Sequence, residues 1–245
     1  MFEAVFISDL HLHPDDTIIT NRFYQFIDWA ASNTTSVYIL GDFFHVWPGD
    51  DALDEWSTSI AKRLAWLAAQ GVALYFMSGN RDFLLGGNFL TLARVNRLVE
   101  PALITLNNES VLLVHGERYC TQDKGHQWLR RLTRNRIFPW IFLRFPYGLR
   151  NRLVNKVRQH SQTNRRKSSE QMDVVPLSMI RHMKRMQVKT VIHGHTHKPG
   201  LTTHDDHAQK YKQYVLSDWD DSPLILCYNN TGEFYYDLTF GGRDG

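Results

Sequence analysis

Five short polar motifs in this sequence contain side chains of the kinds that bind divalent metal ions. The motifs are Asp9-Leu10-His11, Gly41-Asp42, Gly79-Asn80-Arg81-Asp82, His115-Gly116 and His193-Gly194-His195-Thr196-His197. Carboxylate oxygens, amide oxygens and neutral imidazoles are common metal ligands, and three alternating histidines seldom serve packing. The set predicts a metal centre with these candidate ligands: Asp9, His11, Asp42, Asn80, His115, His195 and His197.

Each motif taken alone also has a purely structural interpretation. Asp9 can be an exposed loop acid next to an unrelated histidine. Asn80 can occupy an ordinary turn, which its side chain favours by bonding to nearby backbone. His115 can be a buried core histidine. What distinguishes the motifs is their common position in the chain, because each directly follows a short apolar segment.

These apolar segments predict five β-strands, at 4–8, 37–40, 72–77, 111–114 and 190–192. Helical periodicity in residues 21–31 and 52–70 separates the first three strands, which predicts an α/β fold. In such sheets ligands bind beyond the carboxyl ends of strands, so five strand ends can converge on one site. The segment 211–237 alternates β-rich runs with turns and is predicted to form closing strands.

Length and composition favour one domain over residues 1–245, with an inserted helical lid at about 119–173 where the alternation breaks. The chain has 245 residues, of which 43% are hydrophobic and 22% charged, and a net charge of +3. The two cysteines, Cys120 and Cys227, form no CxxC pair and are predicted to be free thiols of a reducing compartment. No signal peptide and no 18-residue apolar run is recognisable, so we expect a cytoplasmic protein.

The insertion is strongly basic. Residues 127–167 contain twelve Lys and Arg but no Asp or Glu, interleaved with Trp128 and the apolar run 137–143. Basic and aromatic side chains together suit an anionic lipid surface or a lid over acyl chains. Two other interpretations remain: a basic helical hairpin packed on the core, and a surface for nucleic acid.

The five motifs, in this order and over nearly the whole chain, resemble the calcineurin-like metallophosphoesterase superfamily. The resemblance implies two mixed β-sheets packed face to face with flanking helices, a four-layer αββα form of the α/β (α+β) class, plus an inserted helical lid. It implies that Asp42 bridges two metal ions. The first ion is then bound by Asp9, His11, Asp42 and His197, and the second by Asp42, Asn80, His115 and His195. This oxygen and nitrogen ligand set suits Mn²⁺ or Fe²⁺ and admits Zn²⁺, Co²⁺ or Ni²⁺; the resemblance favours two Mn²⁺ ions.

Arg81 departs from the pattern GNH(D/E) of many superfamily members, in which a histidine assists the leaving group. Arginine holds its proton near neutral pH and cannot serve as a general acid. It can instead bind a phosphate through two parallel hydrogen bonds. Arg81 therefore favours a substrate with a good leaving group, such as one half of a pyrophosphate.

Four longer segments are similar to one branch of the superfamily, which acts on UDP-2,3-diacylglucosamine in lipid A biosynthesis. They are SDLHL (8–12), YILGDFF (38–44) with Trp47 and Gly49-Asp50-Asp51 beyond it, GNRDFLLG (79–86) and IHGHTHKP (192–199). The resemblance implies hydrolysis of the pyrophosphate to UMP and 2,3-diacylglucosamine 1-phosphate, with water attacking the α-phosphorus. It implies a catalytic role for Arg81 beside the seven ligands. Its implied substrate contacts are Asn80, Arg81, Asp123, Ser161, Asn164, Lys167 and His195.

The same resemblance implies a peripheral protein on the cytoplasmic side of the inner membrane. Its expected partners are the glycolipid substrate and the anionic membrane surface, with no nucleic acid and no obligate protein partner. Three alternatives remain: a soluble phosphoesterase acting on a small nucleotide, a nuclease with an open basic groove, and a non-catalytic scaffold. The scaffold is disfavoured because all seven candidate ligands are present.

Overall fold

The computed structural model describes residues 1–135, 137–163, 173–206, 209–221 and 223–238. The first sheet contains six strands in the order β11-β10-β1-β2-β3-β4 and the second contains five in the order β5-β6-β7-β9-β8. The strands are β1 (Ala4–Ile7), β2 (Ser36–Leu40), β3 (Ala73–Met77), β4 (Asn96–Leu98), β5 (Ala102–Leu106), β6 (Glu109–Leu113), β7 (Thr190–His193), β8 (Gly200–Asp206), β9 (Gln209–Val215), β10 (Ile225–Tyr228) and β11 (Phe234–Asp237). Each sheet is mixed: β1, β2, β3 and β4 run parallel, as do β6, β7 and β9, whereas β10, β11, β5 and β8 pair antiparallel.

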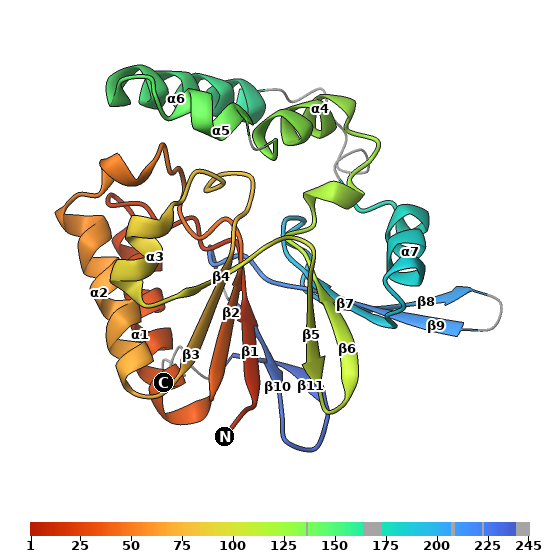
Figure 1. Ribbon diagram of the computed structural model, residues 1–245. Helices are drawn as coiled ribbons and strands as arrows, with labels where there is room; N and C mark the ends of the chain where they lie inside the picture. Colours follow the sequence, from red (N-terminus) through yellow and green to blue (C-terminus); the bar gives the residue numbers. More distant parts are fainter. Residues whose placement is uncertain (136, 164–172, 207–208, 222, 239–245) are drawn as a thin grey trace.

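The two sheets pack face to face, and helices cover both outer faces (Figure 1). The helices are α1 (Thr17–Asn33), α2 (Glu55–Ala69), α3 (Gly87–Ala93), α4 (Lys124–Thr133), α5 (Ile137–Phe142), α6 (Tyr147–Thr163) and α7 (Pro176–Arg185), with short 3₁₀ turns η1 (Asp50–Ala52) and η2 (Glu117–Tyr119). Helices α1, α2 and α3 lie against the first sheet and α7 against the second. This gives the four-layer αββα arrangement that the sequence predicted.

Three apolar clusters separate these layers. The largest lies between the first sheet and α1 to α3 and is rich in aromatic side chains such as Phe23, Phe26 and Phe76. A second cluster fills the space between the two sheets, where Phe6 and Ile192 from opposite sheets are both fully buried. Alternate residues of a strand point to opposite faces, so β1 and β7, whose residues are all buried, pack against a neighbouring layer on each side. The strand ends are thereby fixed relative to one another.

Helices α4, α5 and α6, here called the cap, lie above the carboxyl ends of the central strands (Figure 1). They fall within residues 119–173, where the sequence predicted a helical insertion; the division into a domain and a lid stays a prediction. Within the part of the chain that the structure describes, every helix is too short or too polar to span a lipid bilayer. Cys120 and Cys227 are free and buried, as expected.

Candidate active site

The residues that follow β1, β2, β3, β6 and β7 meet beyond the carboxyl ends of these strands, below the cap. Asp9 and His11 follow β1, Asp42 follows β2, and Asn80 follows β3. His115 follows β6, and the last two histidines of the final motif, His195 and His197, follow β7. The first three strands belong to one sheet and the last two to the other, so the site forms where the two sheets face each other.

The backbone at these strand ends is unusual. Among the described residues nine non-glycine residues have positive φ, and five of them are predicted metal ligands. These are Asp9 (φ 56), His11 (φ 51), Asp42 (φ 52), His195 (φ 71) and His197 (φ 54). Left-handed backbone is unfavourable for residues with a Cβ and persists where surrounding contacts enforce it, most often at functional sites. The backbone at these strand ends is therefore locally strained, and in this conformation the side chains converge on one place.

Asp9 lies at the centre of the cluster. One oxygen, Oδ2, accepts hydrogen bonds from Ser8 Oγ (2.6 Å) and from the backbone N–H of His195 (2.8 Å). The other oxygen, Oδ1, is buried and accepts no well-directed hydrogen bond among the described residues, although His197 Nε2 lies 3.4 Å away. Both ring nitrogens of His11 are likewise buried without a hydrogen-bond partner. Buried polar atoms are rarely left unsatisfied. These orphaned ligand atoms fit a bound cation.

Two groups of three side chains have their ligand atoms within 4.8 Å of one another. The first group is Asp9, His11 and His197, and the second is Asp9, Asp42 and His115. Asp9 belongs to both groups, whereas the resemblance gave the bridging role to Asp42. The role of Asp42 as a bridge stays a prediction.

Asp42 is held by the loop that follows β3. Its Oδ1 accepts the backbone N–H of Arg81 (2.9 Å), and its Oδ2 lies 3.5 Å from the Arg81 Nε. A Cβ at Gly79 would collide with the Asp42 carboxylate, so only glycine permits this approach. Asp82, fully buried, accepts the backbone N–H groups of Gly79 (2.6 Å) and Phe43 (2.7 Å) and ties the two loops together.

Two histidines are oriented by hydrogen bonds on the ring nitrogen that faces away from the cluster. His115 Nδ1 donates to Leu40 O (2.8 Å), which leaves Nε2 facing Asn80 Oδ1 (3.0 Å). His197 Nδ1 lies 3.0 Å from Asp218 Oδ2, and its Nε2 lies 3.4 Å from Asp9 Oδ1. Metal-binding histidines typically have such a partner on the second nitrogen, because it fixes the tautomer and the ring orientation.

The electrostatics of the cluster call for a positive charge. Burial alone would lower the pKa of His115, but the carboxylates of Asp42 and Glu117 outweigh burial and raise that pKa to about 9. Burial raises the pKa of Asp42. Burial lowers the pKa of His11, and the nearby Arg81 charge lowers it further. The carboxylates thus favour a positive charge, here the proton on His115, and a metal cation bound among them would have the same electrostatic effect.

A chain of three hydrogen bonds supports the last motif from behind. His204 Nε2 lies 2.7 Å from Gln213 Oε1, and Gln213 Nε2 lies 2.8 Å from His193 Nε2. His193 Nδ1 lies 2.7 Å from the carbonyl oxygen of Gly194. Burial lowers the pKa of His193 to about 4, so the ring is neutral with one proton. Only one direction satisfies every atom: each donor points inward, from His204 to the Gly194 carbonyl.

Arg81 lies between two cavities. The larger, of about 530 Å³, is bounded by the start of α1 and by His13, His45 and His197. The smaller, of about 200 Å³, lies under the cap and is lined largely by apolar side chains: Val46, Phe83, Leu129, Phe138, Phe142, Leu153 and Val154. Of the residues that line either cavity, Arg81 alone lines both.

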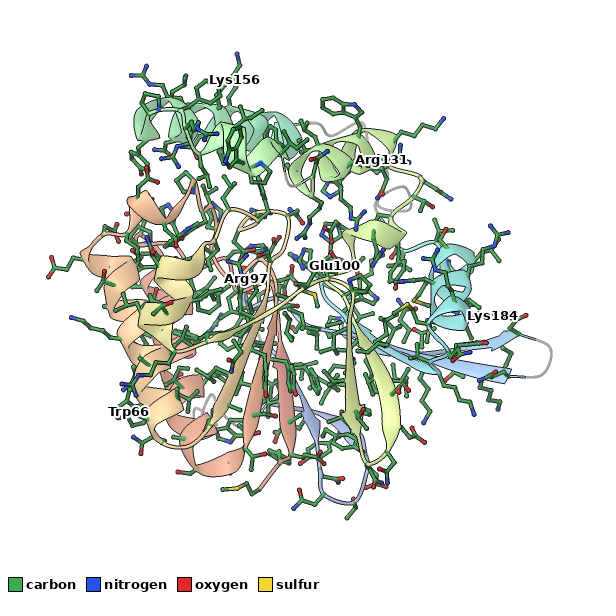
Figure 2. The ribbon with its side chains drawn as sticks, viewed as in Figure 1. Trp66, Arg97, Glu100, Arg131, Lys156 and Lys184 are labelled. Carbon is green, nitrogen blue, oxygen red and sulfur yellow. The ribbon has the colours of Figure 1, made fainter. Side chains whose placement is uncertain are left out.

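Arginine side chains attach the cap to the loops below it. Arg134, which follows α4, donates to Glu117 Oε1 (2.8 Å) and to Ser78 O (2.9 Å), and it lies 3.6 Å from Glu100 Oε2. Arg130 of α4 lies 3.5 Å from Glu117 Oε1. Figure 2 shows Glu100 near the top of the two sheets, below the cap. Arg150 of α6, only 1% exposed, pairs with Asp51 and donates to Phe145 O and Pro48 O.

The structure places the predicted substrate-contact residues unevenly. Asn80 and Arg81 line the cavity under the cap, together with His126 of α4, whose ring centroid is 5.3 Å from that of His195. Asp123 is buried and caps α4 by accepting the backbone N–H of His126 (2.9 Å). Ser161 lies in α6, but its side chain is outside the described residues, as are Asn164 and Lys167.

Several positioning residues escaped the sequence analysis. Asp82 was noticed only as part of its motif, while Asp218, Gln213, Glu117 and Arg134 were not singled out at all. Asp82 follows Asn80 by two residues, and that spacing is a local signal of its position beside the site. Glu117 likewise follows His115 by two residues. Gln213, Asp218 and Arg134 lie in parts of the chain distant from the motifs they support, and no local pattern marks them.

Comparison with known protein families shows which class of protein this is. The family model of the calcineurin-like phosphoesterases matches residues 3–199. The chain belongs to the calcineurin-like phosphoesterase family. A solved structure of an archaeal phosphodiesterase superposes with a TM-score of 0.51 over 96% of this chain and 98% of that one, at 12% identity. That likeness supports the fold alone.

More similar relatives narrow the comparison. A protein of Stutzerimonas stutzeri is 41% identical over 227 residues, which cover 92% of this chain and 95% of its own. A protein of Pseudomonas aeruginosa is 42% identical over 230 residues, 94% of this chain and 96% of its own. Both are named UDP-2,3-diacylglucosamine hydrolase. The similarity thus extends through the cap as well as the sheets.

Proposed function

We propose that this protein hydrolyses the pyrophosphate bond of UDP-2,3-diacylglucosamine, giving UMP and 2,3-diacylglucosamine 1-phosphate. The observation that carries the proposal is Arg81, which lies beside the Asp9–Asp42 cluster and lines both a polar and an apolar cavity. A substrate with two chemically different halves joined by a pyrophosphate fits that arrangement. The names of the relatives support the same reaction.

The cofactor we propose is a pair of Mn²⁺ ions. Asp9, His11, Asp42 and His197 would hold one ion, and Asp42, Asn80, His115 and His195 the other. The orphaned atoms of Asp9 and His11 support a cation there. When bound, the metal ions lower the pKa of a water molecule and neutralise charge on the phosphoryl oxygens. The mixed oxygen and nitrogen ligands favour Mn²⁺ over thiolate-seeking metals.

The residues of the chain supply orientation and charge. Arg81, fixed by its backbone bond to Asp42, places a guanidinium where a pyrophosphate oxygen can receive two hydrogen bonds. A phosphate monoester is a good leaving group and needs little protonation, so no general acid is required on that side. We propose that water attacks the α-phosphorus, with Asn80 and His195 completing the contacts to the substrate.

The cavity under the cap suits the acyl chains. Phe138 and Phe142 of α5 stack with ring centroids 5.3 Å apart, and Phe83 from the β3 loop lies 6.4 Å from Phe138. Burial of an acyl chain among such side chains is favourable by about 0.8 kcal/mol per CH₂ group. The cap would therefore select lipid over soluble nucleotides.

We also propose that the cap holds the protein at the cytoplasmic surface of the inner membrane. Between positions 128 and 153, nine large hydrophobic side chains are exposed, including Trp128 (65%) and Trp140 (61%). Exposed basic residues surround them, and Figure 2 shows Lys156 projecting from α6 away from the sheets. Apolar and cationic groups together favour adsorption to anionic lipid. The basic, apolar cap disfavours a soluble nucleotide as the main substrate.

The test is to offer the purified protein UDP-2,3-diacylglucosamine with Mn²⁺ in ¹⁸O-water and to identify the products by mass spectrometry. We expect UMP and the lipid phosphate, with the label in UMP. Label in the lipid phosphate would reverse the site of attack. Undiminished turnover after exhaustive chelation would contradict the proposed metal dependence. Absence of turnover with Mn²⁺ present would contradict the proposed substrate.

A further inference from the structure

The larger of the two cavities, here called the α1 pocket, is the part of the site that the acyl chains leave unused. It opens beside His11 and His197 and extends along the first turn of α1, with a volume of about 530 Å³. Of the residues that line this pocket, the sequence predicted a functional role only for His11, Arg81 and His197. Resting on the proposed function, we infer that the α1 pocket binds the nucleoside of the substrate, so that Arg81 lies at the pyrophosphate between nucleoside and lipid.

The walls of the pocket offer flat and apolar faces for a base. The imidazole rings of His13 and His45 lie edge to face with centroids 5.2 Å apart. Ile18, in the first turn of α1, is 64% exposed and lines the same pocket. Ile18 and the two imidazoles give a pyrimidine ring one apolar face and one aromatic edge to stack on.

The charge of the pocket selects a neutral ligand part. Asp15, Asp16 and Asp220 line it, whereas its only Lys or Arg is Arg81, at the end next to the Asp9–Asp42 cluster. Carboxylates accept hydrogen bonds from ribose hydroxyls and from a pyrimidine N–H. They repel further phosphates, so a nucleic-acid strand or a polyphosphate running along the pocket is disfavoured.

The opposite placement of the substrate is disfavoured on the same grounds. Acyl chains in the α1 pocket would lie against carboxylates. A ribose under the cap would share a cavity in which seven of the thirteen lining residues are apolar, among them Phe138 and Phe142. Leaving a hydroxyl without a partner in an apolar cavity costs about 1–3 kcal/mol. The two cavities therefore impose one direction on the substrate. The phosphorus next to the nucleoside lies on the His11 and His197 side, and the lipid phosphate on the Asn80 side.

The experiment compares binding of the two halves, which needs no turnover. UMP and 2,3-diacylglucosamine 1-phosphate are titrated separately into the Mn²⁺-loaded full-length protein by calorimetry. His13→Ala and Ile18→Glu are the pocket variants, and Leu129→Ala under the cap is the matched control. We expect each pocket variant to weaken UMP binding about tenfold, the loss of one stacking face, with lipid-phosphate binding changed less than about twofold. Leu129→Ala should show the reverse.

Each outcome decides something. If the pocket variants weaken both ligands equally or neither, the α1 pocket does not bind the nucleoside. The pocket variants could lose UMP binding selectively while the parent protein does not hydrolyse UDP-2,3-diacylglucosamine. In that case the assignment of the pocket holds and the proposed reaction is wrong. Two pocket variants guard against a folding defect, because both side chains are at least partly exposed and a circular dichroism melt identifies any misfolded protein.

Discussion

The loops at the carboxyl ends of the strands and the cap above them are fixed in place by different kinds of contact. In the loops, neighbouring strand ends bond directly to the functional side chains, as when His195 N–H and Arg81 N–H bind Asp9 and Asp42. The cap instead contacts the loops below it through the ionic contacts of Arg130, Arg134 and Arg150. Apolar side chains add to these contacts, such as Phe142, which packs into the largest core cluster. Its outer face exposes large apolar side chains.

This difference separates chemistry from selectivity. The loops are fixed by the registers of two buried sheets and cannot move without breaking β-pairing, which suits groups that must keep sub-ångström geometry. The cap can change its apolar lining without disturbing that geometry. We therefore expect loop variants to change turnover on every substrate alike, and cap variants to change the preference for lipid.

The largest effect is expected from the loops. Asp42→Ala should lower kcat/KM by at least about a thousandfold, because it removes a carboxylate shared by both proposed ions. His11→Ala should cost less, since it affects one ion. Steady-state kinetics with elemental analysis of bound Mn²⁺ measures both variants. Equal and mild losses would show that Asp42 is not a bridge, and would favour Asp9, which belongs to both clusters in the structure.

The next largest effect is expected from the cap. Replacing residues 137–143 by a short Gly-Ser linker should reduce the preference for UDP-2,3-diacylglucosamine over UDP-N-acetylglucosamine by about a hundredfold, because remote acyl binding no longer orients the pyrophosphate. Bound Mn²⁺ should be unchanged. The measurement is the ratio of kcat/KM for the two substrates. A trimmed protein that keeps both its metal and its preference would make α5 a purely structural element.

The fold, and the gathering of Asp9, His11, Asp42, His115 and His197 at one place, were predictable because their signals are local. The metal ions themselves stay a prediction. Each strand that carries a ligand ends in a motif, so the predicted strands at 4–8 and 37–40 correspond to β1 and β2. Short elements held by distant residues were missed. Helix α3 begins at Gly87 without a capping side chain of its own. Instead Asp50, 38 residues away, accepts the backbone N–H of Asn88.

The same reasoning applies to the site. Gln213 and Asp218 approach it from β9 and the loop beyond, and only the pairing of β7 with β9 brings Gln213 beside His193. The motif residues Trp47 and Asp50 show the reverse case. The resemblance drew attention to them, and the structure gives them a supporting role in which Trp47 Nε1 donates to Asp50 Oδ1 (3.0 Å).

A smaller effect tests the attachment of the cap. Arg150→Leu should lower the free energy of unfolding by about 2 kcal/mol, because the buried carbonyl of Pro48 and the carbonyl of Phe145 lose their donor. Amide exchange in α6 should rise, while bound Mn²⁺ stays unchanged. Arg152→Leu, on the exposed side of the same helix, is the matched control. If the two variants exchange alike, Arg150 does not anchor α6 and the contrast between loops and cap weakens.

The smallest effect concerns the hydrogen-bond chain from His204 to Gly194, which runs across strands β8, β9 and β7 and supports the loop that follows β7. Gln213 donates to His193 Nε2 and so keeps the His193 proton on Nδ1, where it binds the Gly194 carbonyl. That carbonyl also accepts the backbone N–H of Thr196 (2.9 Å), so the chain fixes the turn between His195 and His197.

Gln213→Leu removes the donor and leaves His193 Nε2 unsatisfied, so the turn is expected to loosen. We expect Mn²⁺ affinity, measured by calorimetry, to fall about tenfold, the usual effect of losing a group that orients a ligand. Lys212→Leu, an exposed neighbour on β9, is the control and should bind Mn²⁺ normally. Gln213→Glu separates orientation from packing, because it keeps the volume and the contact to His204 but cannot donate to His193 when ionised. If the Glu variant binds Mn²⁺ as tightly as the parent protein, the proton on His193 is not what positions the turn, and Gln213 acts through packing alone.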